Sequence, residues 1–559
     1  MATIPPVLEE LGKTRDLSDS EQGGPASKRQ RTDDGILVLS EVDLRSSNPS
    51  KPSKNHKRLT KRQKKKAEKF AEPCSSEDVL WKDLVSVLGQ DEVDKAIEGE
   101  TDMKSPFEIH QEIEVEVKIL GSNGDGIAVP VDSKQPWAVV VPLTLPGERV
   151  RTRIYRQARL HSVGDLLEVI TPNTTLRDSS RIQCKYFGSC GGCQYQMLSY
   201  ETQLEFKREV VVKAFRNYCN ILSEQMPTIQ PTAPSPLQYG YRTKLTPHFE
   251  APSRKIQKGP RPPTDVQPEW LQIGFNRIGT RKVLDIEECP IASPVINAQI
   301  GPTREHVIKT SHTYTKGVSL LFRDSLDTAV DANPDSVDRL SDAFNKHICI
   351  TNHKETCREQ VGDFIFEYNA GSFFQNNNSV LPPLTNYVRD AIFPPSATEP
   401  STLTHLVDTY CGAGLFAIVL SPFFQKVAGI ELSQDSIRFA THNAKLNSIS
   451  EEKISFRSGD AAEIFAVVRE FPKDQTAVLI DPPRKGCDEV FIKQLLEFGP
   501  KTVVYVSCNV HTQARDIAQI MERGKEEGVT KYRLESVKGF DLFPQTAHVE
   551  SVAVLRRVD

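Results

Sequence analysis

The chain has 559 residues, of which 38% are hydrophobic and 26% charged, with a formal net charge of −4 at pH 7. At roughly 100–200 residues per domain, this length predicts about three domains with sizeable cores. No long apolar run and no apolar leader occur, and the eleven cysteines are sparse, so we expect neither a membrane span, nor a targeting presequence, nor a disulfide scaffold.

Residues 1–104 are rich in charge, poor in aromatic side chains and without sustained periodicity, which predicts a disordered extension. Between Lys51 and Lys69 it carries ten Lys/Arg against one acid. Such a run is typical of a nuclear localisation signal, a nucleic-acid-binding arm or a solubilising tail, and the three readings stay open. A short helix around Ser76–Glu98 fits the apolar spacing. We expect the protein in the nucleus and/or the cytoplasm.

Residues 105–172 predict a small β-barrel. Ile113–Val117 alternates apolar and polar residues, as a half-buried strand does, and four further short apolar runs follow between turn residues. About five strands in so short a stretch suggest a closed barrel of the OB-like kind. Arg149, Arg151 and Arg153 share one strand face. This face is interpreted either as an RNA-binding surface or as an ordinary solvated face.

The rest of the chain divides into a mixed α+β central domain, 173–366, and a catalytic domain, 367–559. The central domain contains an amphipathic helix over Gln203–Tyr218. From about Thr404, short apolar strands alternate with helix-length segments. This alternation predicts an α/β, Rossmann-like fold with a largely parallel sheet.

A glycine-containing turn follows the strand that ends near Asp408. In Asp408–Phe416 two glycines lie between a strand and a helix, where they let a ligand approach the backbone. Glu431 ends the next strand, at a place where an acid can bind ribose hydroxyls. The third glycine of the dinucleotide fingerprint is missing, which favours a nucleoside cofactor over a dinucleotide. The alternative is a tight turn without a ligand.

Three further candidates lie at later strand ends. Asp481 precedes two prolines that stiffen the backbone, an arrangement suited to holding a planar base. Cys508 ends another apolar strand and could be a nucleophile, with Cys411 and Cys487 as competitors, although a lone cysteine is commonly a small core residue. The remaining candidates, which could act as a base, are His548 and Glu550.

Four cysteines have the spacing of a metal site. Cys184, Cys190 and Cys193 lie close together among glycines, and Cys289 follows later before a proline. This pattern is typical of an iron–sulfur cluster, with zinc or structural thiols as alternatives.

Together these motifs resemble the family of RNA uracil-C5 methyltransferases that use S-adenosylmethionine. The resemblance covers about residues 107–559. It rests on the Cys184–Gln196 signature, on Gly371–Asn377 and on the strand-end motifs in their order along the chain. It implies a TRAM-type barrel, a [4Fe-4S] domain and a Rossmann-like S-adenosylmethionine-dependent methyltransferase domain.

The resemblance also implies roles for particular residues. Cys508 would be the nucleophile that adds to C6 of uracil, and Glu550 the base that removes the C5 proton. Contacts to the cofactor or the target site are implied for Gln375, Tyr410, Glu431 and Asp481, and metal binding for Cys184, Cys190, Cys193 and Cys289. A reactive thiolate needs a positive neighbour, for which we name Arg515.

The expected substrate is uridine 54 of tRNA, and the expected enzyme a monomer. Methylation of ribosomal RNA is the alternative substrate assignment, since the cysteine signature is similar to that of rRNA-modifying members. An inactive RNA-binding relative is the alternative from another class. An iron–sulfur radical methylase is disfavoured, because the cysteine spacing differs from the Cys-x3-Cys-x2-Cys pattern that such enzymes need.

Overall fold

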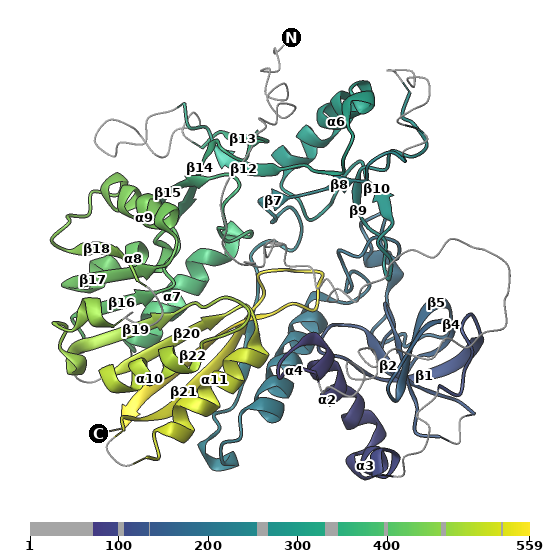
Figure 1. Cartoon of the computed structure of the whole chain (residues 1–559), viewed down its shortest axis with the longest axis horizontal. Helices are drawn as coiled ribbons and strands as arrows, with labels where there is room; N and C mark the ends of the chain where they lie inside the picture. Colours follow the sequence, from purple (N-terminus) through teal and green to yellow (C-terminus); the bar gives the residue numbers. More distant parts are fainter. Residues whose placement is uncertain are drawn as a thin grey trace, which may run out of the picture.

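The computed structural model describes residues 71–98, 105–132, 135–253, 256, 266–329, 345–395, 401–459, 465–526 and 529–558. The basic run Lys51–Lys69 and the remainder of 1–70 lie outside these ranges. Three regions surround a central crossing of loops: a small barrel, a mixed central region and a large sheet with helices on its faces (Figure 1). Among the described residues, none of the helices combines the length and apolar character that crossing a membrane requires.

The predicted barrel is confirmed. Its strands are β1 (Glu112–Leu120), β2 (Gly126–Pro130), β3 (Ala138–Val141), β4 (Arg149–Ala158) and β5 (His161–Thr171). They close in the order β1-β2-β3-β5-β4. Alternate residues of β4, such as Val150 and Ile154, are buried in the barrel core, while their neighbours face solvent. Strict alternation is what a half-buried strand requires, and it made this region predictable from the sequence.

The prediction of a disordered extension over 1–104 is wrong for residues 71–98. They form α2 (Ser76–Leu88) and α3 (Gln90–Glu98), in agreement with the helix expected around Ser76–Glu98. Leu84 packs against the outer wall of the barrel, and Val93 is buried with its core cluster. The ordering therefore comes from burial against the barrel, a tertiary contact that composition does not reveal.

The central region consists of α6 and short strands in small sheets. Its elements are β7 (Lys244–Leu245), β8 (His248–Phe249), β9 (Gly274–Asn276), β10 (Val283–Asp285), α6 (Pro294–Lys309), β11 (Val318–Ser319), β12 (Phe322–Leu326), β13 (His347–Ile350), β14 (Thr356–Val361) and β15 (Phe364–Asn369). The sheets have the orders β10-β9-β8-β11, β13-β12-β7 and β14-β15. This is the mixed α+β organisation that the sequence predicted.

The catalytic region contains an eight-stranded sheet in the order β18-β17-β16-β19-β20-β22-β21-β6. Its elements are α7 (Leu381–Ile392), β16 (His405–Thr409), α8 (Leu415–Leu420), β17 (Lys426–Glu431), α9 (Gln434–Leu446), β18 (Ile454–Ser458), β19 (Thr476–Ile480), α10 (Glu489–Phe498), β20 (Thr502–Ser507), α11 (Val510–Arg523), β21 (Lys531–Phe540) and β22 (Glu550–Val558). Strands β18, β17, β16, β19 and β20 pair in parallel, and β22 inserts antiparallel beside β20. The predicted Rossmann-like α/β fold is confirmed.

Two elements from the segment assigned to the central domain belong to the catalytic region instead. Strand β6 (Gln230–Ala233) pairs with β21 at the sheet edge, and helix α4 (Tyr200–Tyr218) packs against α11. Figure 1 shows α4 running between the sheet and the barrel. The sequence gives little sign of β6, because Gln-Pro-Thr-Ala lacks the alternation of a strand and its place is set by the pairing partner.

Candidate active site

The predicted functional residues converge on one edge of the large sheet. Parallel strands place their carboxyl ends at the same edge, and ligands bind there in α/β folds. Four predicted residues follow or end such strands: Tyr410 after β16, Glu431 in β17, Asp481 after β19 and Cys508 after β20. All four residues are partly buried.

The turn after β16 is held in a left-handed conformation by its neighbours. Tyr410, Gly412 and Gly414 have φ of 63°, 54° and 92°. The backbone N–H of Gly412 donates to Glu431 Oε2 at 3.3 Å, and the N–H of Ser433 donates to Oε1 at 2.9 Å. Glu431 therefore fastens the glycine turn to the end of β17, which shapes the edge that a nucleoside would meet.

Asp408 is a residue whose importance only the structure shows. It is 1% exposed, and its Oδ2 accepts a hydrogen bond from the N–H of Ala417 at 2.9 Å, whereas Oδ1 has no partner. Burial raises the pKa of this carboxyl well above its usual range, and Asp481 and Glu431 add to the rise. A buried acceptor without a partner is costly unless a ligand satisfies it. Asp408 Oδ1 is thus an unused acceptor at the start of the glycine turn.

Cys508 and Glu550 lie side by side across two neighbouring strands. In the antiparallel pair of β20 and β22, Ser507 is opposite Ser551. Cys508 is the next residue after Ser507 and Glu550 the one before Ser551, so the register brings a thiol and a carboxyl together. Residues 42 positions apart in the sequence are joined in this way only because β22 runs antiparallel to its neighbour.

Both groups are electrostatically perturbed. Burial raises the pKa of Glu550 to about 7, and the guanidinium of Arg484 opposes the rise. Burial also raises the pKa of the Cys508 thiol to about 12, helped by Glu550 and Asp481, while Arg484 acts in the opposite direction. Glu550 Oε2 is buried without a hydrogen-bond partner. A carboxyl with a pKa near neutrality and a free oxygen is suited to accept a proton.

Arg484, rather than Arg515, is the positive neighbour of Cys508. The guanidinium of Arg515 donates to Asp516 Oδ1 at 2.6 Å and to the carbonyl of Lys485 at 2.9 Å, so its charge is paired elsewhere. Arg484 lies in the motif that begins with Asp481, and its carbonyl accepts a hydrogen bond from Asn509 Nδ2 at 2.9 Å, which ties this motif to the residue after Cys508. The expectation for Arg515 is therefore wrong.

The competing thiols have structural surroundings. Cys411 is buried, and a Cβ on Gly429 would lie 3.0 Å from its sulfur. Cys487 is buried with its sulfur 3.8 Å from the hydroxyl of Tyr505. His548 is kept neutral, since burial lowers its pKa to about 3. Its backbone carbonyl accepts a hydrogen bond from Lys207, and its ring packs edge-on against Phe543 with Nε2 3.9 Å from Glu550 Oε1.

Gln375 is held by three consecutive asparagines that follow it. Asn376 Oδ1 accepts from the buried Arg323 at 3.0 Å, and Asn378 Nδ2 donates to Glu359 at 3.0 Å. Between them, Asn377 Nδ2 donates to the carbonyl of Leu542 at 3.0 Å. Gln375 itself is 7% exposed. The fold therefore fixes the backbone at Gln375 against both the central region and the loop that leads to Glu550.

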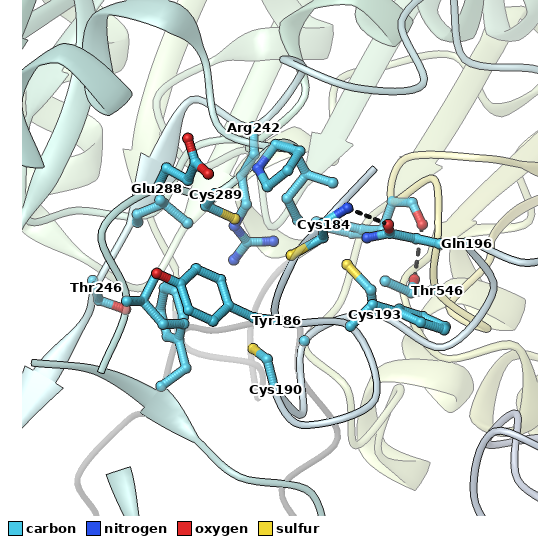
Figure 2. Close-up of a pocket in the computed structure, with 18 residues that line it drawn as sticks. Cys184, Tyr186, Cys190, Cys193, Gln196, Arg242, Thr246, Glu288, Cys289 and Thr546 are labelled. Carbon is cyan, nitrogen blue, oxygen red and sulfur yellow. Dashed lines mark hydrogen bonds between the residues drawn. The ribbon is translucent and has the colours of Figure 1, made fainter. Parts of the chain in front are cut away.

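The four cysteines of the predicted metal site line one pocket. Figure 2 shows the thiols of Cys184, Cys190, Cys193 and Cys289 around it, with Arg242 alongside. Each thiol has its pKa raised, by burial first, and in Cys190, Cys193 and Cys289 also by neighbouring cysteines. Within the described part of the chain, no group of three or more His, Cys, Asp or Glu side chains is arranged to hold a metal ion. A metal at this pocket stays a prediction.

The arginine face of the barrel is neutralised by acids. The three arginines of this face each pair with a glutamate on a neighbouring strand: Arg149 with Glu114 at 2.5 Å, Arg151 with Glu168 at 2.7 Å and Arg153 with Glu112 at 2.9 Å. All six side chains are about half exposed. An alternating ladder of opposite charges attracts a phosphate backbone weakly, which favours the solvated-face reading over the RNA-binding one.

Known proteins resemble the chain over most of its length. A family model described as tRNA (uracil-5-)-methyltransferase matches residues 323–558. The Schizosaccharomyces pombe protein named tRNA (uracil(54)-C(5))-methyltransferase is 44% identical over 504 residues, which cover 90% of this chain and 87% of that protein. A Saccharomyces cerevisiae protein of the same name is 36% identical over 516 residues, covering 87% and 78%.

A solved structure shares the fold. The Pyrococcus abyssi tRNA (uracil-54, C5)-methyltransferase, in complex with S-adenosyl-L-homocysteine, aligns with a TM-score of 0.53 and 22% identity. The match covers 79% of this chain and all of that one.

Proposed function

The chain belongs to the tRNA (uracil-5-)-methyltransferase family, and on that premise we propose that it transfers a methyl group from S-adenosylmethionine to C5 of uridine 54 in tRNA. The observation that carries the proposal is that Cys508 and Glu550 lie directly beyond the Ser507–Ser551 pair that joins β20 and β22. A thiol beside a carboxyl whose pKa is raised to about 7 supplies the two groups that this reaction needs.

The residues divide the chemistry between them. C5 of uracil is a poor nucleophile until the Cys508 thiolate adds to C6, which makes C5 electron-rich. C5 then takes the methyl group from the sulfonium, which leaves as a neutral thioether. Glu550 accepts the remaining C5 proton, the C5–C6 double bond re-forms and the sulfur of Cys508 departs. Arg484 stabilises the thiolate, and the positive sulfonium acts in the same direction.

The other strand-end residues shape the binding site for S-adenosylmethionine. Glu431 ends β17, where a carboxylate can accept hydrogen bonds from ribose hydroxyls, and Tyr410 lines the glycine turn. The unpartnered oxygen of Asp408 offers an acceptor at the same edge. Asp481 follows β19 at the same edge and is assigned to contact with the cofactor or the target base, and burial raises its pKa well above the usual range. Gln375 is assigned to the cofactor.

Transfer of labelled methyl groups to unmodified tRNA tests the proposal. We expect label in wild-type tRNA, recovered as 5-methyluridine, and none in tRNA with cytidine in place of uridine 54. Ribosomal RNA serves as the competing substrate in a parallel reaction. Label in ribosomal RNA alone would keep the chemistry and overturn the choice of substrate, and absence of label from every RNA would support the inactive RNA-binding alternative.

We propose separately that the cysteine pocket holds a [4Fe-4S] cluster. Four cysteines, the ligand set of such clusters, line one pocket although Cys289 is far from the others in the sequence. Bound there, the cluster would hold residues 184–193 against Cys289. The methyl transfer itself moves no electrons between metal and substrate, since the sulfonium methyl group is already activated.

Anaerobically purified protein is expected to be brown and to contain iron and acid-labile sulfide. Cys190→Ser should lose most of the iron, because a hydroxyl is a poorer ligand than a thiolate. Cys349→Ser is the matched control, since this cysteine does not line the pocket, and it should keep the iron. A colourless protein with stoichiometric zinc would refute the iron assignment.

A further inference from the structure

The loop between β21 and β22, Asp541–Val549, is buried at seven of its nine residues and leads directly into Glu550. It has no regular secondary structure to hold it, and Gln545 has a left-handed backbone with φ of 71°. Glu550 begins β22 and is opposite Phe540 of β21, so the sheet holds its backbone on one side and the loop holds it on the other.

A single buried lysine binds both ends of this loop. Lys207, in the middle of α4, is 0% exposed, and its ammonium group has three acceptors. They are the carboxylate of Asp541, the carbonyl of Phe543 at 2.9 Å and the carbonyl of His548 at 2.9 Å. An ammonium group has three N–H donors, so this set uses all of them.

Neighbouring side chains of α4 complete the attachment. Tyr200 donates to the other oxygen of Asp541 at 2.9 Å. Gln203 accepts from the N–H of Gln545 at 3.0 Å, and its own amide donates to the Gln545 side chain at 3.1 Å. The loop is thus attached to one face of α4 along its whole length, with Lys207 at the centre.

Burying the charges of Lys207 and Asp541 costs free energy, so we expect the pair to have a role beyond packing. Moving an ammonium and a carboxylate out of water is repaid only when the geometry is good and every remaining donor and acceptor is satisfied. Burial lowers the pKa of Lys207, against the attraction of Asp541. A hydrophobic pair at this place would pack as well, but it could not bind the carbonyls of residues 543 and 548 and so could not set the shape of the loop.

We propose that Lys207 is the positioning residue for Glu550: it holds both ends of Asp541–Val549 and thereby places the Glu550 carboxyl for removal of the C5 proton. The proposal rests on the proposed function. Addition of Cys508 and methyl transfer take place at the end of β20 and use no side chain of the loop. Loosening the loop therefore slows one step, the release of methylated tRNA from Cys508, more than the others.

The test uses Lys207→Met in the full chain and follows two products over time. One is the protein–tRNA adduct that carries labelled methyl and survives denaturation in SDS, and the other is released 5-methyluridine in tRNA. We expect release to fall about 10–100-fold, as for a displaced catalytic group, while methyl enters the adduct at a rate close to wild type. The adduct should accumulate as a result.

Two further variants make the outcome decisive. Lys207→Met combined with Asp541→Asn leaves no unpaired charge in the core and keeps an acceptor for Tyr200, and it should show the same accumulation. Lys213→Met is the matched control on the same helix, because Lys213 donates to the carbonyl of Leu120 in the barrel instead of to the loop. It should release tRNA at the wild-type rate, and thermal unfolding confirms that each variant is folded.

The proposal is overturned if folded Lys207→Met and its double variant release methylated tRNA at the wild-type rate, or lose methyl transfer and release in equal proportion. Glu550→Gln separates this failure from that of the proposed function. If Glu550→Gln accumulates the adduct and Lys207→Met does not, only the positioning role fails. If wild type releases no 5-methyluridine and Glu550→Gln forms no adduct, the proposed function fails first.

Discussion

Replacing Cys508 with alanine is expected to lower methyl transfer to tRNA by about 10⁴-fold or more, because no other group at the site can add to C6. The rate of label transfer at saturating tRNA measures this effect. Cys508 stands at the end of β20, beside Glu550 on β22, and Arg484 is the charged group that favours its thiolate. The substitution removes the nucleophile while leaving the hydrogen-bonded strands intact, so binding of tRNA should change little.

The matched control is Cys487→Ala. The sequence leaves Cys487 as an alternative nucleophile, but its sulfur is buried beside Tyr505. This variant should keep most of the activity and still form a covalent adduct with tRNA that carries 5-fluorouridine at position 54. The fluorine replaces the proton that must leave, so the adduct persists. Loss of the adduct in Cys487→Ala together with its retention in Cys508→Ala would show that Cys487, and not Cys508, is the nucleophile.

Much of the fold follows from local sequence patterns. The alternation in β1 and β4 and the apolar runs of β16, β19 and β20 are properties of a few consecutive residues, and the structure has strands at each of these places. The order of a parallel sheet then brings strand ends together without further information. Glu431, Asp481 and Cys508 could be named from the sequence for this reason.

Contacts between distant segments could not be predicted in this way. Arg515 is the candidate positive neighbour of Cys508 on the sequence, but Asp516 and the Lys485 carbonyl engage its guanidinium. Lys207 is one of many lysines in the sequence, and nothing local shows that it is buried against Asp541, more than three hundred residues later. Pairing choices of this kind depend on three-dimensional packing.

The barrel, the cysteine segment and α4 all reach the same loop. A Cβ on Gly124, in the turn between β1 and β2, would lie 2.6 Å from the Cβ of Ala547, so barrel and loop are in close contact there. The backbone N–H groups of Gln194 and Tyr195, beside the cysteine pocket, donate to the carbonyl of Gln545 at 2.9 and 3.0 Å. The loop before Glu550 is therefore the point at which the separate regions act on the chemistry.

Substituting glutamine for Glu550 should stop the reaction after methyl transfer, with release of product slowed by about 10²–10⁴-fold. Glutamine has nearly the same shape but cannot take the C5 proton, so methylated tRNA remains bound to Cys508. The measurement is the ratio of SDS-stable, methyl-labelled adduct to free 5-methyluridine. His548→Gln is the control at the neighbouring candidate base and should release product far faster than Glu550→Gln.

The pH dependence of release follows from the same carboxyl. Burial raises the pKa of Glu550 to about 7, so lowering the pH below 7 protonates it and removes the base. Release by the wild type should therefore fall about tenfold for each pH unit below this value, whereas release by Glu550→Gln should not follow this titration. Release by Glu550→Gln at the wild-type rate, with the wild-type pH profile, would place the base elsewhere. If Glu550→Gln accumulates the adduct and its release rate does not change with pH, Glu550 is the base of the last step. The pKa of this base is set by its burial and by the opposing charge of Arg484.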